Sequence, residues 1–70
     1  MDLVQLRYFK VVAEEGSMTR AARVLRVSQP TLTVAIRNLE QSLRTILFHR
    51  ARNGVQLTAT GRELLEQTRD

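Results

Sequence analysis

The fold is decided by residues 17–43, which read SMTRAARVLRVSQPTLTVAIRNLEQSL. Apolar residues recur at helical spacing on both sides of a short interruption. They are Met18, Ala21, Ala22 and Leu25, then Leu32, Ile36, Leu39 and Leu43. Ser17 and Ser28 precede the two sets as N-caps, and Pro30 fits a first helical turn, where amides lack intrahelical partners. The stretch therefore predicts two amphipathic helices, the second over about residues 29–43, joined by only about three residues.

Such a short connection makes the helices cross steeply, so the start of the second helix projects while its aliphatic stripe stays buried. Helical geometry then turns outward Gln29, Thr33, Arg37 and, toward one edge, Thr31, Val34 and Asn38. Amide, hydroxyl and guanidinium groups are the kinds that bind base edges in the grooves of DNA. The start of this helix is thus a candidate DNA-reading surface. The other interpretation is that Gln29 and Thr33 are simply solvated polar residues.

Positive charge is concentrated in the middle of the chain. The 70 residues carry a formal net charge of +4. Residues 16–57 contain seven arginines and one glutamate, a net +6, whereas the outer segments together carry −2. A basic surface attracts polyanions through its long-range field and through counterion release, and nucleic acid is the commonest such partner. Charge alone also allows a surface that only solubilises the domain.

One further helix is predicted before this stretch, and a hairpin and another helix after it. Leucine, phenylalanine and valine at Leu3, Leu6, Phe9 and Val12 predict a helix over about residues 2–15 with its stripe toward the core. Short β-compatible runs at about 47–50 and 55–57 predict a hairpin across Arg52-Asn53-Gly54, because asparagine and glycine both accept positive φ. Thr58 is a candidate cap for a last helix that continues to Asp70.

These residues together resemble the N-terminal domain of LysR-type transcriptional regulators over about residues 3–61. The resemblance is carried by Ala21-Ala22, Leu25, Ser28-Gln29-Pro30, Leu32, Ile36, Leu39-Glu40, Leu43, Leu47-Phe48 and Arg50. It implies a mainly α winged helix-turn-helix: a three-helix core, a two-stranded β-hairpin wing and the start of a linker helix. Residues 1–58 would form the winged helix-turn-helix domain and residues 59–70 the truncated start of the linker, or dimerisation, helix.

The resemblance also implies where DNA would lie. The recognition helix, about residues 29–43, would enter the major groove, and the wing, residues 50–54, would meet the backbone or the minor groove. Combined with the outward positions given above, the candidate DNA-binding residues are Ser28, Gln29, Pro30, Thr31, Thr33, Val34, Arg37, Arg50, Arg52 and Asn53. The implied partners are double-stranded DNA and further copies of the full-length protein, which would form a homodimer or a higher oligomer through the linker helix. A small-molecule effector would bind only through a separate C-terminal domain.

Several positions leave alternatives open. Val34 and Ala35 stand where the family usually has larger polar or basic side chains, so a protein-interaction module on the same scaffold is the competing function. Arg44 stands where the family usually has glycine. Either the third helix ends differently, or Arg44 is left-handed at a cost of about 1 kcal/mol. Arg37 has a second possible partner in Glu40, three residues on.

The composition argues against other classes of function. There is no cysteine and one histidine, His49, so neither a disulfide framework nor a metal site is expected. The sequence shows no pairing of a nucleophile with a base and no glycine-rich phosphate loop, so we expect neither an enzyme nor a cofactor. Three aromatic residues are too few for a single-strand stacking surface, which favours duplex DNA over RNA. Without a signal or a membrane-spanning run, a cytoplasmic, nucleoid-associated protein is expected.

Overall fold

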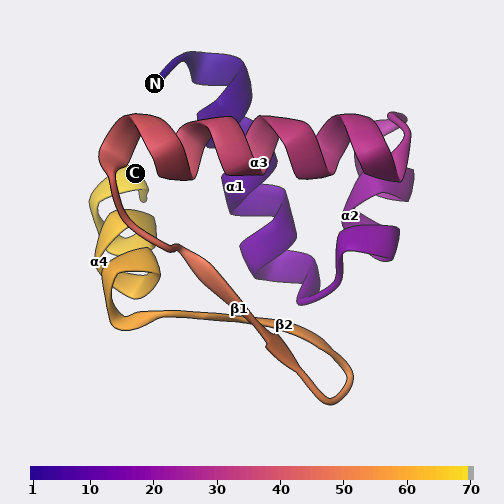
Figure 1. The fold of residues 1–70 in the computed structure, drawn as a ribbon. Helices are drawn as coiled ribbons and strands as arrows, with labels where there is room; N and C mark the ends of the chain where they lie inside the picture. Colours follow the sequence, from indigo (N-terminus) through magenta and orange to yellow (C-terminus); the bar gives the residue numbers. More distant parts are fainter. Residues whose placement is uncertain (70) are drawn as a thin grey trace.

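A computed structural model of the chain describes residues 1–69. The order of elements is α1 (Leu3–Glu15), α2 (Met18–Leu25), α3 (Gln29–Leu43), β1 (Phe48–Ala51), β2 (Gly54–Leu57) and α4 (Ala59–Thr68). Figure 1 shows α3 crossing in front of α1, with α2 at one end of α3 and α4 near the other. The predicted mainly α fold, with three core helices and a two-stranded hairpin, is confirmed.

Each helix begins at a side-chain cap. The cap residues are Asp2, Ser17, Ser28 and Thr58, and each accepts a hydrogen bond from the backbone N–H three residues later. At Asp2 the arrangement is reciprocal, because the Gln5 side chain accepts from the Asp2 amide. Such caps accept hydrogen bonds from N–H groups that have no partner within the helix. The start of each helix is therefore determined by residues close to it in the sequence.

Helices α2 and α3 both end at an arginine in the left-handed region. Arg26 has φ 59° and ψ 41°, and Arg44 has φ 54° and ψ 43°. The amide after each arginine bonds back to the carbonyl five residues earlier, Val27 to Ala22 and Thr45 to Glu40, both at 3.0 Å. This is the Schellman pattern that glycine usually completes. Of the two alternatives for Arg44, the structure therefore adopts the left-handed one.

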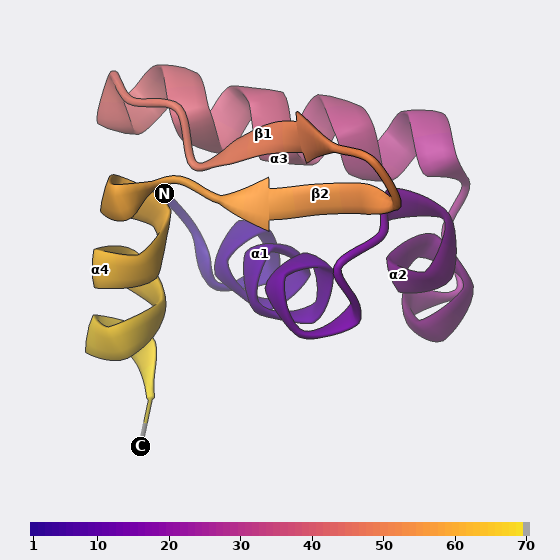
Figure 2. The same cartoon turned by 90° about the horizontal axis from the view of Figure 1, so that it is seen from below.

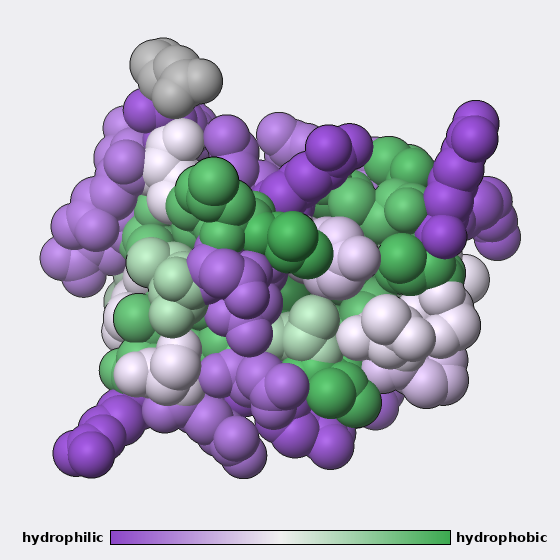
Figure 3. Space-filling view, turned by 90° about the horizontal axis from the view of Figure 1, so that it is seen from above, coloured by the Kyte–Doolittle hydropathy of each residue, from purple (hydrophilic) through white to green (hydrophobic). Residues whose placement is uncertain are grey.

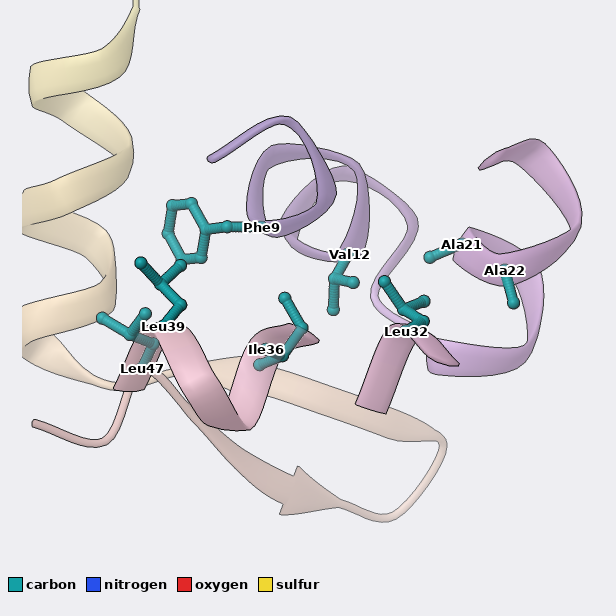
Figure 4. Packing of buried hydrophobic residues seen from close by; sticks show 8 residues of the cluster. All are labelled: Phe9, Val12, Ala21, Ala22, Leu32, Ile36, Leu39 and Leu47. Atoms are coloured by element: carbon teal, nitrogen blue, oxygen red, sulfur yellow. The ribbon is translucent and has the colours of Figure 1, made fainter. Parts of the chain in front are cut away.

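The core lies between the first three helices and the segment that leads into the hairpin. Its buried side chains are Phe9, Val12, Ala21, Ala22, Leu32, Ile36, Leu39 and Leu47, which converge in Figure 4. Each of the predicted apolar stripes of α1 and α3 is wrong at one end, where a leucine expected in the core is exposed. Leu3 is 85% exposed because the first turn of α1 extends past α3 (Figure 1), and Leu43, the last residue of α3, is 37% exposed.

The hairpin is antiparallel and is shifted by one residue from the predicted first strand. Phe48 pairs with Leu57 and Ala51 with Gly54, so the turn consists of Arg52 and Asn53. Leu47 lies outside the ladder because its amide donates to Glu40 and its carbonyl accepts from Thr58. The expectation of positive φ at Asn53 is wrong: within residues 1–69 only Arg26 and Arg44 combine a side chain with positive φ.

Glycine at position 54 is required both by its backbone conformation and by its packing. It has φ 145°, and a Cβ there would overlap the carbonyl oxygen of Gly16, between α1 and α2. The same carbonyl accepts a hydrogen bond of 3.1 Å from the amide of Val55. The hairpin is therefore fastened to the connection between α1 and α2, and Figure 1 shows it below α3 and diverging from that helix toward the turn, while Figure 2 gives the view from below.

Helix α4 is joined to the core at its first turn. The Thr58 hydroxyl donates to the Ile46 carbonyl at 2.6 Å, and a Cβ on Gly61 would overlap the carbonyl oxygen of Leu47. Lys10 donates from Nζ to the carbonyl of Thr68 at 3.3 Å, near the end of the helix. The helix ends at Thr68, and Arg69 has an extended backbone with φ −74° and ψ 142°. The expectation that the helix continues to the end of the chain is therefore wrong at Arg69, and Asp70 lies outside the described residues.

Candidate nucleic-acid interface

The start of α3 presents a polar surface to solvent. Its exposed predicted residues are Ser28, Gln29, Pro30, Thr31, Val34 and Arg37, and Thr33 is half-buried. The opposite face of the helix is anchored by Leu32 and Ile36, which are 0% and 6% exposed. The sequence-predicted orientation of α3 is therefore the one in the structure.

Hydrogen bonds fix several of these side chains before any ligand arrives. The Ser28 hydroxyl accepts from the Thr31 amide at 3.1 Å and donates to the Thr31 hydroxyl at 2.8 Å. The Thr19 hydroxyl, from α2, donates to Oε1 of Gln29 at 3.2 Å. Sequence reasoning missed Thr19. Its contact joins residues ten positions apart, and only the crossing of α2 over α3 brings them together.

A groove of about 310 Å³ separates α3 from the hairpin. Polar and cationic side chains line it from three elements and from the N-cap of α2: Ser17, Thr19, Gln29, Thr33, Arg37 and Arg50. Arg37 on α3 and Arg50 on β1 both line this groove, although they come from different elements. The basic residues that the sequence places thirteen positions apart are thus part of one surface.

Glu40 does not neutralise Arg37. Its Oε2 accepts from the backbone amides of Leu47 at 2.8 Å and of Phe48 at 3.3 Å. Within residues 1–69 the ion pairs are Arg20–Glu15 and Arg69–Glu66, so the alternative pairing of Arg37 with Glu40 is not formed. Sequence reasoning also missed this role of Glu40, whose only sequence signal is that it is the single acid in the basic middle segment.

The hairpin carries the remaining predicted residues. Arg50 on β1 and Arg52 and Asn53 in the turn are all exposed. The neighbouring His49 is exposed as well, and its Nδ1 lies 3.3 Å from the carbonyl oxygen of Arg50. The turn with Arg52 and Asn53 lies at the end of the hairpin that is far from α4 (Figure 1).

The start of α3 offers little to a hydrophobic partner. Val34 is 53% exposed, and Ala35 next to it is half-buried. In Figure 3, which looks onto α3 and the start of α1, hydrophobic and hydrophilic residues are interspersed. A binding surface for a protein usually needs a large central apolar or aromatic anchor, which Val34 does not provide.

Two further observations concern the described part of the chain. No three histidine, aspartate or glutamate side chains in residues 1–69 are grouped as a metal ion would require. No helix in the same range combines the length and the apolar character needed to cross a membrane.

Comparison with known proteins identifies relatives over almost the whole chain. The model of the family described as "Bacterial regulatory helix-turn-helix protein, lysR family" matches residues 3–62. The chain is 52% identical over 69 residues to the HTH-type transcriptional regulator ClcR of Pseudomonas putida, covering 99% of the chain and 24% of ClcR. It is 44% identical over 66 residues to YofA of Bacillus subtilis, covering 94% of the chain and 23% of YofA. The chain thus spans about a quarter of the length of these relatives.

Solved structures show the same fold at similar identity. The CbnR DBD–DNA complex matches with a TM-score of 0.91 and 45% identity, covering 96% of the chain and 77% of that structure's chain. The BenM DBD/catB site 1 DNA complex matches with a TM-score of 0.91 and 40% identity, covering 96% and 75%.

Proposed function

We propose, because this chain belongs to the lysR family of bacterial regulatory helix-turn-helix proteins, that it binds duplex DNA sequence-specifically as the DNA-binding domain of a LysR-type transcriptional regulator. The observation that carries the proposal is the exposed, polar start of α3 beside an arginine-bearing hairpin. Support also comes from the two similar domains that were solved as DNA complexes.

In this proposal α3 enters the major groove with its first turns against the bases. Gln29 offers an amide, and Thr33 offers a hydroxyl and a methyl group, which suit hydrogen bonds to base edges and contact with thymine methyl groups. Ser28 and Thr31 keep their capping contacts and lie beside a phosphate, while Pro30 and Val34 make apolar contacts with the groove. Arg37, free of Glu40, is available for a base or a phosphate.

The groove between α3 and the hairpin would receive the sugar–phosphate ridge that separates a major groove from the next minor groove. Arg37 and Arg50, which line that groove, would neutralise its phosphates. Arg52 and Asn53, at the exposed turn, would then reach the minor groove or its edge, where negative potential is strongest when the groove is narrow.

The rest of the assembly is proposed on the same basis. Residues 1–58 form the DNA-binding unit, and residues 59–70 begin a linker helix through which two copies pair. Two-fold pairing would match half-sites about one helical turn apart or multiples of it. Effector binding belongs to a part of the relatives that this chain does not span. The protein acts in the bacterial cytoplasm, at the nucleoid.

Selection of bound duplexes from a random pool tests the proposal directly, because it reports binding, base preference and half-site symmetry together. Gln29→Ala is expected to relax base preference at one position, whereas Arg52→Ala is expected to weaken all selected duplexes by a similar factor. Each effect follows from the kind of atom contacted, a base edge or the backbone.

Two outcomes would contradict the proposal. One is recovery of no enriched sequence from the pool. The other is an equal loss of discrimination from Gln29→Ala and Arg52→Ala, which would remove the division between base-reading helix and backbone-binding hairpin. A protein-interaction role for the same face would instead predict that Val34→Asp, and not Gln29→Ala, abolishes binding of the partner.

A further inference from the structure

We propose that Thr19 is a specificity-determining residue, which orients the amide of Gln29 and so sets the base that Gln29 prefers. This inference rests on the proposed function, because it concerns how the same surface reads DNA. It starts from one contact: Thr19 Oγ1 on α2 donates to Gln29 Oε1 on α3 at 3.2 Å.

Thr19 is held in place by the packing of its helix. Ser17 caps α2 through the amide of Arg20, and Ala21 and Ala22 are 0% and 5% exposed in the core. Gln29 is equally well placed, since it is the first residue of α3 and follows the capping residue Ser28. Both ends of the hydrogen bond therefore stand on rigid elements, while the two side chains remain exposed in the groove beside the hairpin.

The bond decides which face of the Gln29 amide is turned outward. With a hydroxyl hydrogen on Oε1, the carbonyl side of the amide is directed at α2, and the two N–H groups on Nε2 are left for a ligand. A free glutamine binds adenine with both ends, accepting from the N6 amino group and donating to N7. The carbonyl oxygen has two lone pairs, and Thr19 occupies only one of them. A glutamine held by Thr19 can therefore still accept from the adenine N6 amino group and donate to N7, but with its amide fixed in one orientation.

The bond matters more in the complex than in the free protein. Both side chains are exposed in the free chain, so water competes for the same groups. When DNA covers the groove, water is excluded and an unpaired polar group carries its full desolvation cost. Loss of the Thr19 hydroxyl is therefore expected to change discrimination between bases more than overall affinity.

The test compares four duplexes that differ only at the base pair where Gln29→Ala loses discrimination. Thr19→Val keeps the shape of the side chain and removes its hydroxyl group, and Thr19→Ser keeps the hydroxyl. The unmodified chain should prefer adenine over guanine at this pair. Thr19→Val should lower that ratio about three- to tenfold, the range expected from one hydrogen bond, while Thr19→Ser should retain most of it.

Other results would overturn the inference. A uniform loss on all four duplexes with Thr19→Val would place the hydroxyl on a phosphate, and an unchanged ratio would show that Thr19 does not act on Gln29. Thr19→Ala serves as a second hydroxyl-free variant, and melting curves for all variants report folding separately. If Gln29→Ala itself changes no base preference anywhere, the proposed reading surface fails, and not the coupling to Thr19 alone.

Discussion

At the scale of single residues, Arg26 and Arg44 set the ends of α2 and α3 in a backbone conformation that glycine adopts more easily. The left-handed region brings Cβ close to the following carbonyl oxygen and costs a non-glycine residue about 1–2 kcal/mol. The Schellman hydrogen bonds that follow both arginines compensate part of this cost by pairing the last carbonyls of each helix. The backbone at Arg26 and Arg44 is thus locally strained.

Arg44→Gly is therefore expected to raise the free energy of unfolding by about 0.5–1 kcal/mol. Relief of the left-handed strain exceeds the extra backbone entropy that glycine gives the unfolded chain. Chemical denaturation measures the change. Arg23→Gly, at an exposed position inside α2, is the matched control and should lower stability by about 1 kcal/mol. Equal losses from both substitutions would show that Arg44 is not strained.

At the scale of elements, the sequence predicts best what is local. The caps Ser17, Ser28 and Thr58 need only neighbours within a few residues, and the structure has them as expected. The same holds for the aliphatic stripe of α3 as far as Leu39, whereas Leu43 is exposed. Asn53 does not have the predicted positive φ. The contact of Gly54 with Gly16, which lies 38 positions earlier, also has no local signal in the sequence. The prediction that Leu3 faces the core was wrong because helical spacing within α1 does not indicate where the neighbouring helix ends.

Glu40 connects two elements that the sequence treats as separate. Its carboxylate holds the amides of Leu47 and Phe48, at the point where the chain leaves α3 and enters β1. Glu40→Ala is expected to lower the free energy of unfolding by about 1–3 kcal/mol, because two partly buried N–H groups lose a charged acceptor.

Amide hydrogen exchange is the measurement that locates this effect. Exchange at Leu47 and Phe48 should accelerate in Glu40→Ala and less so in Glu40→Gln, which retains an acceptor oxygen. Gln41→Ala, at the exposed neighbouring position, should leave both rates unchanged. Unaltered exchange at Leu47 in Glu40→Ala would contradict the role assigned to the carboxylate.

At the scale of the whole molecule, arginines lie at both ends. Those proposed to contact a duplex lie at one end, and Arg62 on α4 lies at the other. The exposed turn of the hairpin and the start of α3 lie at one end, and α4 lies at the other (Figures 1 and 2). Of the ten candidate residues, nine are exposed and Thr33 is half-buried. Their outward position on α3 could be predicted because the aliphatic stripe marks the buried side of the helix in the sequence. Thr19 and Glu40 were missed, since their partners are defined only once the chain has folded.

This separation makes the salt dependence of duplex binding site-specific. Arg50→Ala and Arg52→Ala should each reduce the slope of log Kobs against log salt by about 0.9, because each removes one neutralised phosphate. Arg62→Ala on α4 should leave the slope unchanged, although it removes the same charge. Equal reductions from all three would mean that net charge, and not the proposed face, governs the affinity.

The fastening of the hairpin at Gly16 has a mechanical consequence. Hydrogen bonds tie the β-ribbon both to Gly16, before α2, and to the carboxylate of Glu40 on α3, so the spacing between the ribbon and α3 is fixed before DNA binds. A duplex that contacts both elements then has to adapt its own curvature and groove width to this spacing. Easily bent base steps between the two contacts would be favoured although no side chain touches them.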